Sequence, residues 1–204
     1  MPKSAKKLRS NPAWIERHIN DPFVKRSKAE GYRARSAYKL LELNEKEKLF
    51  RPGITVVDLG SAPGSWTQVA RSKMVNVAGK FSGHLVAMDI LPMEPVPDAV
   101  FLQGDFREQE VADQLSALLA DGKVDVVLSD MAPNLSGIPA VDAAASLLLN
   151  ELALEFALEH LCENGVLVVK AFQGSGYSQF IETVKRHFKS VAQRKPEASR
   201  DTSP

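Results

Sequence analysis

Two lysines and one aspartate have the residue types that proton transfer requires. Lys170 ends the apolar run GVLVV, and Asp130 follows the run VDVVLS in the segment SDMAPN. Lys39 lies in SAYKLLEL, near a predicted helix start at which Ser36 is the candidate N-cap. A lysine at the end of an apolar strand is costly unless it is paired or reaches a cleft. We therefore interpret Lys170 as a general base; the alternative is a lysine that extends its charge to solvent at a strand edge.

The predicted neighbours of Lys170 act on its proton in opposite directions. Burial and a second ammonium group, here that of Lys39, lower the pKa of a lysine toward the range that suits a base. The Asp130 carboxylate opposes that effect while it orients the ammonium or the substrate. The sequence leaves open which influence is larger.

The segment VVDLGSAPGSW predicts a ligand-binding turn between a strand and a helix. Gly60 and Gly64 allow the backbone to turn sharply and to approach a ligand closely, and the helix start favours a carboxylate or phosphate. The spacing departs from the G-x-G-x-x-G pattern, which disfavours an NAD-dependent oxidoreductase. It has instead the D-x-G-x-x-P-G form of methyltransferases that use S-adenosylmethionine, with Asp58 as its acidic residue.

Two further aspartates follow the next predicted strands. Asp89 ends GHLVAMD, where a carboxylate can accept hydrogen bonds from both ribose hydroxyls. Asp105, in QGDF, is placed to receive the amino group of adenine. Each aspartate taken singly is better explained as a helix N-cap or a turn residue. Together with Asp58, at three successive strand ends, they predict a cofactor site.

Apolar or β-branched runs alternate with helical segments through the middle of the chain. We predict strands at residues 54–60, 83–90, 99–106, 124–131 and 165–172, and helices at 66–74, 107–122, 141–161 and 175–188, with Gly165 as the stop of the long helix. Continuous apolar runs of this length suit strands buried on both faces of a parallel sheet. The alternation predicts an α/β fold with a doubly wound, mostly parallel sheet. The form of the glycine loop then favours the Rossmann-like type of methyltransferases that use S-adenosylmethionine. Ligands of such sheets bind beyond the carboxyl ends of the strands.

The composition indicates one folded domain. The chain of 204 residues is 44% hydrophobic and 25% charged, which excludes a mainly disordered protein. No apolar run approaches the roughly 20 residues of a transmembrane helix, and the basic N-terminus lacks the apolar stretch of a secretory signal. Cys162 is the only cysteine, and no Cys/His cluster suggests a metal site. We expect a monomeric, metal-free protein of the reducing cytoplasm.

The net charge of +1 conceals two basic ends and an acidic middle. Residues 1–50 hold 13 Lys and Arg against 6 Asp and Glu, residues 51–182 hold 7 against 17, and residues 183–204 hold 6 against 2. We therefore divide the chain into a basic helical segment at 1–50 that faces RNA and a methyltransferase domain at 51–204. Clustered cations suggest a phosphate-backbone partner, although a solvated basic arm explains them equally well. The candidate RNA contacts are Lys25, Arg26, Lys28, Arg33, Arg35, Arg194 and Lys195, with Tyr32 and Tyr38 either stacking on a base or packing in the core.

The motifs in order resemble one enzyme family. VVDLGSAPGSW, MDILPM, FLQGDFR, LSDMAPNLSG, VDAAASL and LVVKAFQGSG are similar to the bacterial large-subunit ribosomal RNA 2'-O-ribose methyltransferases of the FtsJ/RrmJ (RlmE) family, over about residues 10–200. The resemblance implies methyl transfer from S-adenosylmethionine to the 2'-oxygen of one uridine in the A loop of 23S ribosomal RNA, on the assembled large ribosomal subunit.

The resemblance also implies roles for individual residues. Residues that match cofactor contacts of the family are Gly64, Trp66, Asp89, Asp105 and Asp130, and we add Asp58 and Gly60 from the same loop. Lys39, Asp130 and Lys170 match three members of the family's K-D-K-E tetrad, with Lys170 as the proton acceptor.

The last residues depart from the family pattern. The segment RKPEASRDTSP ends where the family continues into a further strand that carries the tetrad glutamate. Glu197 matches an earlier acidic residue of the family and is not assigned the tetrad role. We therefore expect the fifth strand to expose an unpaired apolar edge.

Two other functions remain open on the sequence alone. One is a non-catalytic RNA-binding or ribosome-assembly factor on the same fold, which would bind RNA without methyl transfer. The other is a methyltransferase for a non-RNA substrate, which would keep the glycine loop and have no need of basic ends.

Overall fold

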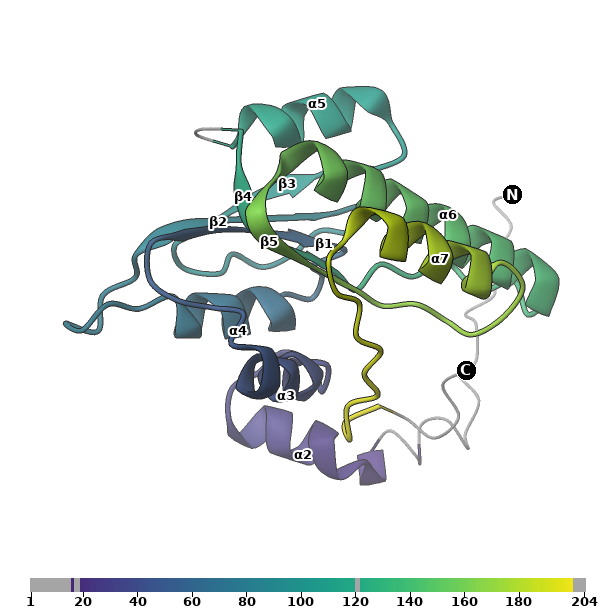
Figure 1. Cartoon of the computed structure of the whole chain (residues 1–204). Coiled ribbons are helices and arrows are strands. Elements are labelled where there is room, and N and C mark those ends of the chain that lie inside the picture. Colours follow the sequence, from purple (N-terminus) through teal and green to yellow (C-terminus); the bar gives the residue numbers. More distant parts are fainter. Residues whose placement is uncertain (1–15, 17–18, 120–121, 200–204) are drawn as a thin grey trace, which may run out of the picture.

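A five-stranded parallel sheet forms the centre of the molecule (Figure 1). The computed structural model describes residue 16, residues 19–119 and residues 122–199. The strands are β1 (Ile54–Leu59), β2 (Gly83–Asp89), β3 (Ala99–Gln103), β4 (Val124–Ser129) and β5 (Leu161–Val169), in the order β3-β2-β1-β4-β5. All neighbouring pairs are parallel, which confirms the predicted α/β fold. The order reverses between β1 and β4, and in such sheets the reversal opens a crevice beyond the carboxyl ends of these strands.

Helices cover both faces of the sheet (Figure 1). One face carries α3 (Ala37–Glu47) and α4 (Ser65–Lys73), with α2 (Pro22–Ala29) outside α3. The other face carries α5 (Gln109–Ala117), α6 (Pro139–His160) and α7 (Tyr177–His187). No helix in the described part of the chain is both long and apolar enough to cross a membrane.

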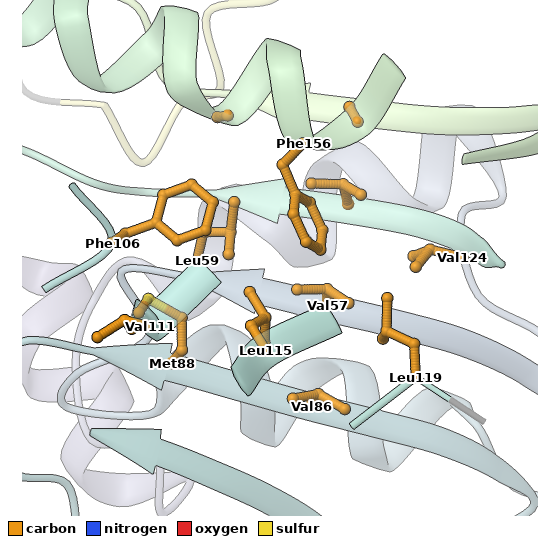
Figure 2. Close-up of a cluster of buried hydrophobic side chains, with 13 residues drawn as sticks. Val57, Leu59, Val86, Met88, Phe106, Val111, Leu115, Leu119, Val124 and Phe156 are labelled. Carbon is orange, nitrogen blue, oxygen red and sulfur yellow. The ribbon is translucent and has the colours of Figure 1, made fainter. Parts of the chain in front are cut away.

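The face beneath α5 and α6 is sealed by a buried apolar cluster (Figure 2). Phe156 of α6 meets the ring of Phe106 edge-on, with 5.7 Å between the ring centroids. Both rings belong to the same cluster as Val57 and Leu59 of β1 and Leu115 of α5. Because alternate side chains of β1 point to this face, the cluster holds the strand that leads into the predicted glycine loop.

The opposite face is sealed by α3 and α4 together. Leu40 of α3 and Val69 of α4 are fully buried in a cluster with Val56 of β1. Trp66, only 4% exposed, lies in the same cluster and donates its indole N–H to the backbone oxygen of Ser36 at 2.9 Å. The basic N-terminal segment therefore shares its core with the sheet.

The two N-terminal helices begin in different ways. Asp21 caps α2, because its carboxylate accepts the backbone N–H groups of Phe23 at 2.9 Å and Val24 at 3.3 Å. Ser36 occupies the residue before α3, as predicted, but its side chain makes no capping bond. Its hydroxyl instead lies 2.7 Å from the hydroxyl of Ser65 at the start of α4. The prediction that Ser36 is the N-cap residue is therefore confirmed, although its side chain does not cap the helix.

The fifth strand begins earlier than predicted. β5 starts at Leu161, directly after α6, whereas the apolar pattern placed its start at Gly165. A register shift opposite Val124 and Val126 accommodates the intervening residues, and Asn164 there adopts a left-handed φ of 64°. Gly165 consequently lies inside the strand and does not end the helix. Lys170 comes immediately after β5, at its carboxyl end.

The outer edge of β5 is open. β5 is the last strand in the sheet order and pairs with β4, and Val166 on this edge is 38% exposed. A groove of about 760 Å³ runs along the strand and is walled on its far side by α7 and residues 187–194. The expected unpaired edge is thus confirmed for the described residues.

The segment that follows α7 crosses to the other face of the sheet (Figure 1). Arg194 forms an ion pair with Glu47 of α3 at 2.8 Å, and the backbone N–H of Glu197 donates to the Glu42 carboxylate at 2.7 Å. The predicted RNA contact Arg194 therefore already has a carboxylate partner within the chain.

Truncating Phe156 to alanine should lower the free energy of unfolding by about 3–5 kcal/mol, because it opens a cavity between α6 and the sheet. The matched control on the same helix is Leu158→Ala, since Leu158 is 45% exposed, and it should cost less than about 1 kcal/mol. Urea unfolding of both variants measures the difference. Equal losses would contradict the assignment of Phe156 to the core.

Candidate functional site

Three aspartates lie close together at the carboxyl ends of β1, β2 and β4. Asp58 pairs in register with Ala87 of β2 and with Leu128 of β4. Asp89 is the last residue of β2, and Asp130 follows the last residue of β4. The sheet therefore brings these predicted site residues together at the crevice, as the strand topology implied.

The glycine loop, residues 60–64, sits against this crevice. Gly60 has a φ of 74° and Gly64 a φ of 106°, both in the left-handed region that favours glycine. A Cβ on Gly60 would come within 2.8 Å of the backbone of Met131, so only glycine allows this approach. α4 begins directly after Gly64, and its first-turn N–H groups have no acceptor within the helix. These groups suit a carboxylate.

Asp89 shapes the glycine loop as well as facing the crevice. One carboxylate oxygen accepts the backbone N–H of Ala62 at 2.9 Å, and the other accepts that of Leu91 at 2.8 Å. The carboxylate is 9% exposed. Asp89 therefore connects the end of β2 to the glycine loop, and its remaining lone pairs can still accept hydroxyl hydrogen bonds.

Asp58 is the most deeply buried charge of the group. Its Oδ2 accepts the hydroxyl of Thr67 at 2.7 Å, whereas Oδ1 is buried and has no hydrogen-bond partner among the described residues. Burial, together with the nearby carboxylates of Asp130 and Asp89, raises the pKa of Asp58 to about 7. An unpaired buried oxygen beside two other carboxylates favours a cationic ligand at this point.

Asp130 and Lys170 form an ion pair across the ends of β4 and β5. Lys170 Nζ lies 2.7 Å from Asp130 Oδ1 and donates to the Asp130 backbone oxygen at 2.5 Å. The ammonium also lies 5.6 Å from the centre of the Phe172 ring. Both side chains are about one-fifth exposed, at 23% and 22%. The prediction that Lys170 is paired beside Asp130 is confirmed.

The remaining predicted site residues differ in their surroundings. Lys39 lies in the first turn of α3, half-buried. The Trp66 side chain points into the core, so only its backbone can face a ligand. Asp105 is held by the guanidinium of Arg107, with contacts of 2.5–3.1 Å, and these bonds hold the pKa of the Asp105 carboxyl below its ordinary value. Arg107 is 58% exposed and can move away from Asp105 at little cost.

Several cations assigned to RNA by the sequence are engaged within the protein. Arg26 pairs with Glu30 at 2.7 Å, and Arg35 pairs with Asp21 at 2.9 Å. Tyr38 is 5% exposed and donates its hydroxyl to Glu30, and this burial raises its pKa to about 12. The packing alternative for Tyr38 is therefore the correct one. Among the candidates on α2, Lys25 and Lys28 are exposed.

Arg33 is a site residue whose role the sequence did not indicate. Its guanidinium binds three backbone oxygens beside the glycine loop. No motif could have revealed this, because backbone oxygens carry no sequence signature. Within residues 19–119 and 122–199, no three His, Cys, Asp or Glu side chains gather in a way that would hold a metal ion.

The chain is similar to known methyltransferases in sequence and in fold. The profile of the FtsJ-like methyltransferase family matches residues 32–204. Proteins named ribosomal RNA large subunit methyltransferase E, from Cupriavidus necator and Bordetella pertussis, are both 56% identical to it, over 97% and 93% of this chain and 93% and 90% of their own. A crystal structure assigned as a ribosomal RNA methyltransferase of Plasmodium falciparum has a TM-score of 0.72 at 30% identity, over 82% of this chain and 93% of that one.

Replacing Asp58 with asparagine should remove part of the pH dependence of stability. Folding raises the pKa of Asp58 from an ordinary value near 3.9 to about 7, so the folded state binds this proton more tightly than the unfolded state. The stabilisation is therefore complete below about pH 4 and is lost as the pH rises through 7, by roughly 1.4 kcal/mol per pH unit. Urea unfolding between about pH 5 and pH 7 should show this slope in the wild type and not in Asp58→Asn.

The control for this measurement is Asp113→Asn, which makes the same change on the exposed side of α5. It should keep the wild-type profile. An Asp58→Asn variant with the wild-type slope would show that Asp58 is not the group that holds the proton.

Proposed function

The chain belongs to the FtsJ-like methyltransferase family, and we propose that it transfers a methyl group from S-adenosylmethionine to the 2'-oxygen of a uridine ribose in the A loop of 23S ribosomal RNA. The relatives from Cupriavidus and Bordetella are named as methyltransferases of large-subunit ribosomal RNA. Their similarity over nearly the whole chain supports large-subunit ribosomal RNA as the class of substrate here. We propose that the chain acts on the assembled large ribosomal subunit in the cytoplasm.

The Asp130–Lys170 pair is the observation that carries this proposal. A 2'-hydroxyl is a poor nucleophile until its proton is removed, so the site needs a positioned base. Lys170 Nζ is held by both the carboxylate and the backbone oxygen of Asp130. It follows the carboxyl end of β5, and the glycine loop follows the carboxyl end of β1, so both lie at the same end of the parallel strands. These two contacts fix the position of Lys170 Nζ and so support its role as the base.

The site residues fit S-adenosylmethionine. Its ligand-binding groups are a cationic sulfonium, an amino acid end and an adenosine end. The Asp58 oxygen that lacks a partner, beside Asp89 and Asp130, suits the positive charge. The first-turn N–H groups of α4, that of Trp66 among them, suit the carboxylate. Asp89 is placed for the ribose hydroxyls, and Asp105 for adenine once Arg107 moves aside.

The chain's own residues then complete the chemistry. S-adenosylmethionine supplies an activated methyl group, so the protein's main task is to align donor and acceptor, which can contribute roughly 7–11 kcal/mol. Lys170, in its neutral form, would accept the proton of the 2'-hydroxyl as the oxygen bonds to the methyl carbon and the bond from that carbon to sulfur breaks, with S-adenosylhomocysteine as the leaving group. Asp130 keeps the nitrogen in place before the transfer and pairs with the ammonium afterwards. Lys39, in the first turn of α3, is the third residue of the proposed catalytic set, and we assign to it the attraction of the RNA backbone.

The proposed RNA surface is narrower than the sequence suggested. Lys25 and Lys28 project from the exposed side of α2, and we assign the RNA-facing role of the N-terminal segment to them. Arg26, Arg35 and Arg194 are paired with carboxylates. Their ion pairs would have to exchange for phosphate contacts.

Replacing Lys170 with methionine should lower methyl transfer about 10²–10⁴-fold, because a positioned base is lost while the apolar stem is kept. Transfer of radiolabelled methyl to large subunits that lack the modification measures this effect. Affinity for S-adenosylmethionine, measured by calorimetry, should change less than about threefold. The control is Lys185→Met, on an exposed lysine of α7 that pairs with Glu182.

The outcomes separate the competing functions. Loss of S-adenosylmethionine binding in Lys170→Met would make Lys170 a structural residue. A wild-type protein that binds S-adenosylmethionine and RNA but transfers nothing would be an RNA-binding factor. Transfer to another substrate without any to ribosomal subunits would identify a methyltransferase for a non-RNA substrate.

Replacing Asp89 with asparagine should weaken S-adenosylmethionine binding about tenfold or more, since hydrogen bonds to a charged group contribute roughly 1.5–3 kcal/mol. Binding of the variant to RNA should stay at the wild-type level. The control is Asp113→Asn, which makes the same change on the exposed side of α5. Unchanged cofactor affinity in Asp89→Asn would remove Asp89 from the site.

A further inference from the structure

We propose that Arg33 is a positioning residue for the cofactor site: it ties the β2–β3 loop, residues 90–98, to the glycine loop and so controls the affinity for the adenosine half of the cofactor. This inference rests on the proposed use of S-adenosylmethionine. It assigns to Arg33 a role different from the RNA contact that its place in a basic segment suggested.

Three hydrogen bonds carry the inference. Arg33 Nη1 donates to the backbone oxygen of Pro63 in the glycine loop at 3.0 Å and to that of Glu94 at 2.6 Å. Nη2 donates to the backbone oxygen of Pro95 at 2.8 Å. One guanidinium therefore bridges two loops that are about thirty residues apart in the sequence, and the bonds use much of its donor capacity.

The β2–β3 loop is anchored at its two ends, where Gln103 donates to the backbone oxygen of Ile90 at 3.3 Å and Arg71 pairs with Asp98 at 2.7 Å, and Arg33 binds its middle. Pro92, Pro95 and Pro97 have no backbone N–H, so the loop cannot be held by regular backbone pairing. Ile90 and Leu91 are 56% and 60% exposed and contribute little packing. The backbone oxygens of Glu94 and Pro95 therefore accept hydrogen bonds from a side chain outside the loop, the Arg33 guanidinium.

The guanidinium is packed directly on the glycine loop. A Cβ at Gly64 would come within 2.6 Å of Arg33 Nη1, 2.9 Å of Met93 Sδ and 3.3 Å of Val96 Cγ2. Gly64 thus lies under both Arg33 and the β2–β3 loop. Val96 is 4% exposed, so this part of the loop is packed down where Arg33 binds it.

Arg33 is itself held in position by α4. Its backbone N–H donates to Gln68 at 3.0 Å, and the Gln68 amide donates back to Gly31 at 3.0 Å. The contact between the hydroxyls of Ser36 and Ser65 anchors the same segment a few residues later. The backbone of Arg33 is therefore held in place, which fixes the position of its guanidinium.

The partners of Arg33 differ in kind from those of its neighbours. Arg26 and Arg35 pair with carboxylates, whereas the Arg33 guanidinium donates hydrogen bonds to three backbone oxygens. The Arg33 guanidinium thus connects the glycine loop to the β2–β3 loop, and we call this connection the clamp. The phosphate of an RNA could bind Arg33 only by displacing these hydrogen bonds.

The clamp acts on the cofactor site through Asp89. Asp89 comes immediately before the β2–β3 loop and binds the N–H groups of Ala62 and Leu91, one on each loop. When Arg33 holds the two loops together, the Asp89 carboxylate keeps the direction that the ribose hydroxyls require. Without the clamp, the β2–β3 loop can move and carry Asp89 with it.

The test compares Arg33→Met with wild type for two ligands, S-adenosylhomocysteine and 5'-methylthioadenosine, which share the adenosine half and differ in the amino acid half. Calorimetry should show both affinities reduced by a similar factor, on the order of tenfold, the size expected for one lost hydrogen bond to a charged group. Transfer at saturating S-adenosylmethionine and affinity for RNA should stay within about threefold. Arg33→Lys should recover part of the loss.

Two further measurements exclude general unfolding, or the loss of any arginine, as the cause of weaker binding. The control Arg51→Met removes an exposed arginine at the far end of the sheet, where it pairs with Asp125, and should leave all ligand affinities unchanged. Hydrogen exchange in Arg33→Lys should rise for the N–H groups of residues 90–98 and stay at the wild-type rate in β1, which separates a released loop from general unfolding.

Each other outcome overturns the inference. Weaker binding of S-adenosylhomocysteine with unchanged 5'-methylthioadenosine would mean that Arg33 contacts the amino acid half directly. Weaker RNA binding with both ligands unaffected would return Arg33 to the RNA surface. A wild-type protein that binds neither ligand would instead refute the proposed cofactor, and thereby the function on which the inference rests.

Discussion

The carboxylates of Asp58, Asp89 and Asp130 lie close together at the ends of β1, β2 and β4 and repel one another. The surrounding structure has to compensate this repulsion. Asp130 is balanced by the ammonium of Lys170. Asp89 is balanced by two backbone N–H groups. Asp58 accepts the Thr67 hydroxyl, and burial, with the neighbouring carboxylates, raises its pKa to about 7, so near neutral pH a bound proton removes part of its negative charge. A ligand that brings a positive charge would reduce the remaining repulsion, which is consistent with the proposed sulfonium cofactor.

The N-terminal segment is part of the site's framework. Its net positive charge suggests an arm for RNA, but the arginines that the structure describes in it, Arg26, Arg33 and Arg35, all have partners within the fold. α3 supplies core residues beneath β1, and Arg33 and Ser36 bind the first turns of α4 and the glycine loop. The segment to which we assign RNA contacts therefore also supports the glycine loop.

The open edge of β5 lies next to the residue proposed as the base. Lys170 follows β5 directly, and its backbone N–H donates to Ser129 of β4 at 2.9 Å. β4 is the only strand that supports β5 in the described sheet, with help from the α7 cluster. The position of Lys170 thus depends on the β4 pairing and on Asp130 rather than on a sheet that continues on both sides.

Local patterns were enough to predict the architecture and the grouping of the aspartates. Strands β1 to β4 end close to their predicted limits because apolar runs and the turn residues after them are local properties of the chain. The parallel topology then places Asp58, Asp89 and Asp130 at one edge. β5 was predicted to begin too late because its first residues join the sheet through a bulge, which depends on the register with Val124 and Val126. The partners of the arginines were not predictable either. Backbone oxygens such as those of Pro63, Glu94 and Pro95 are alike in every sequence, and only the folded chain brings them within reach of Arg33.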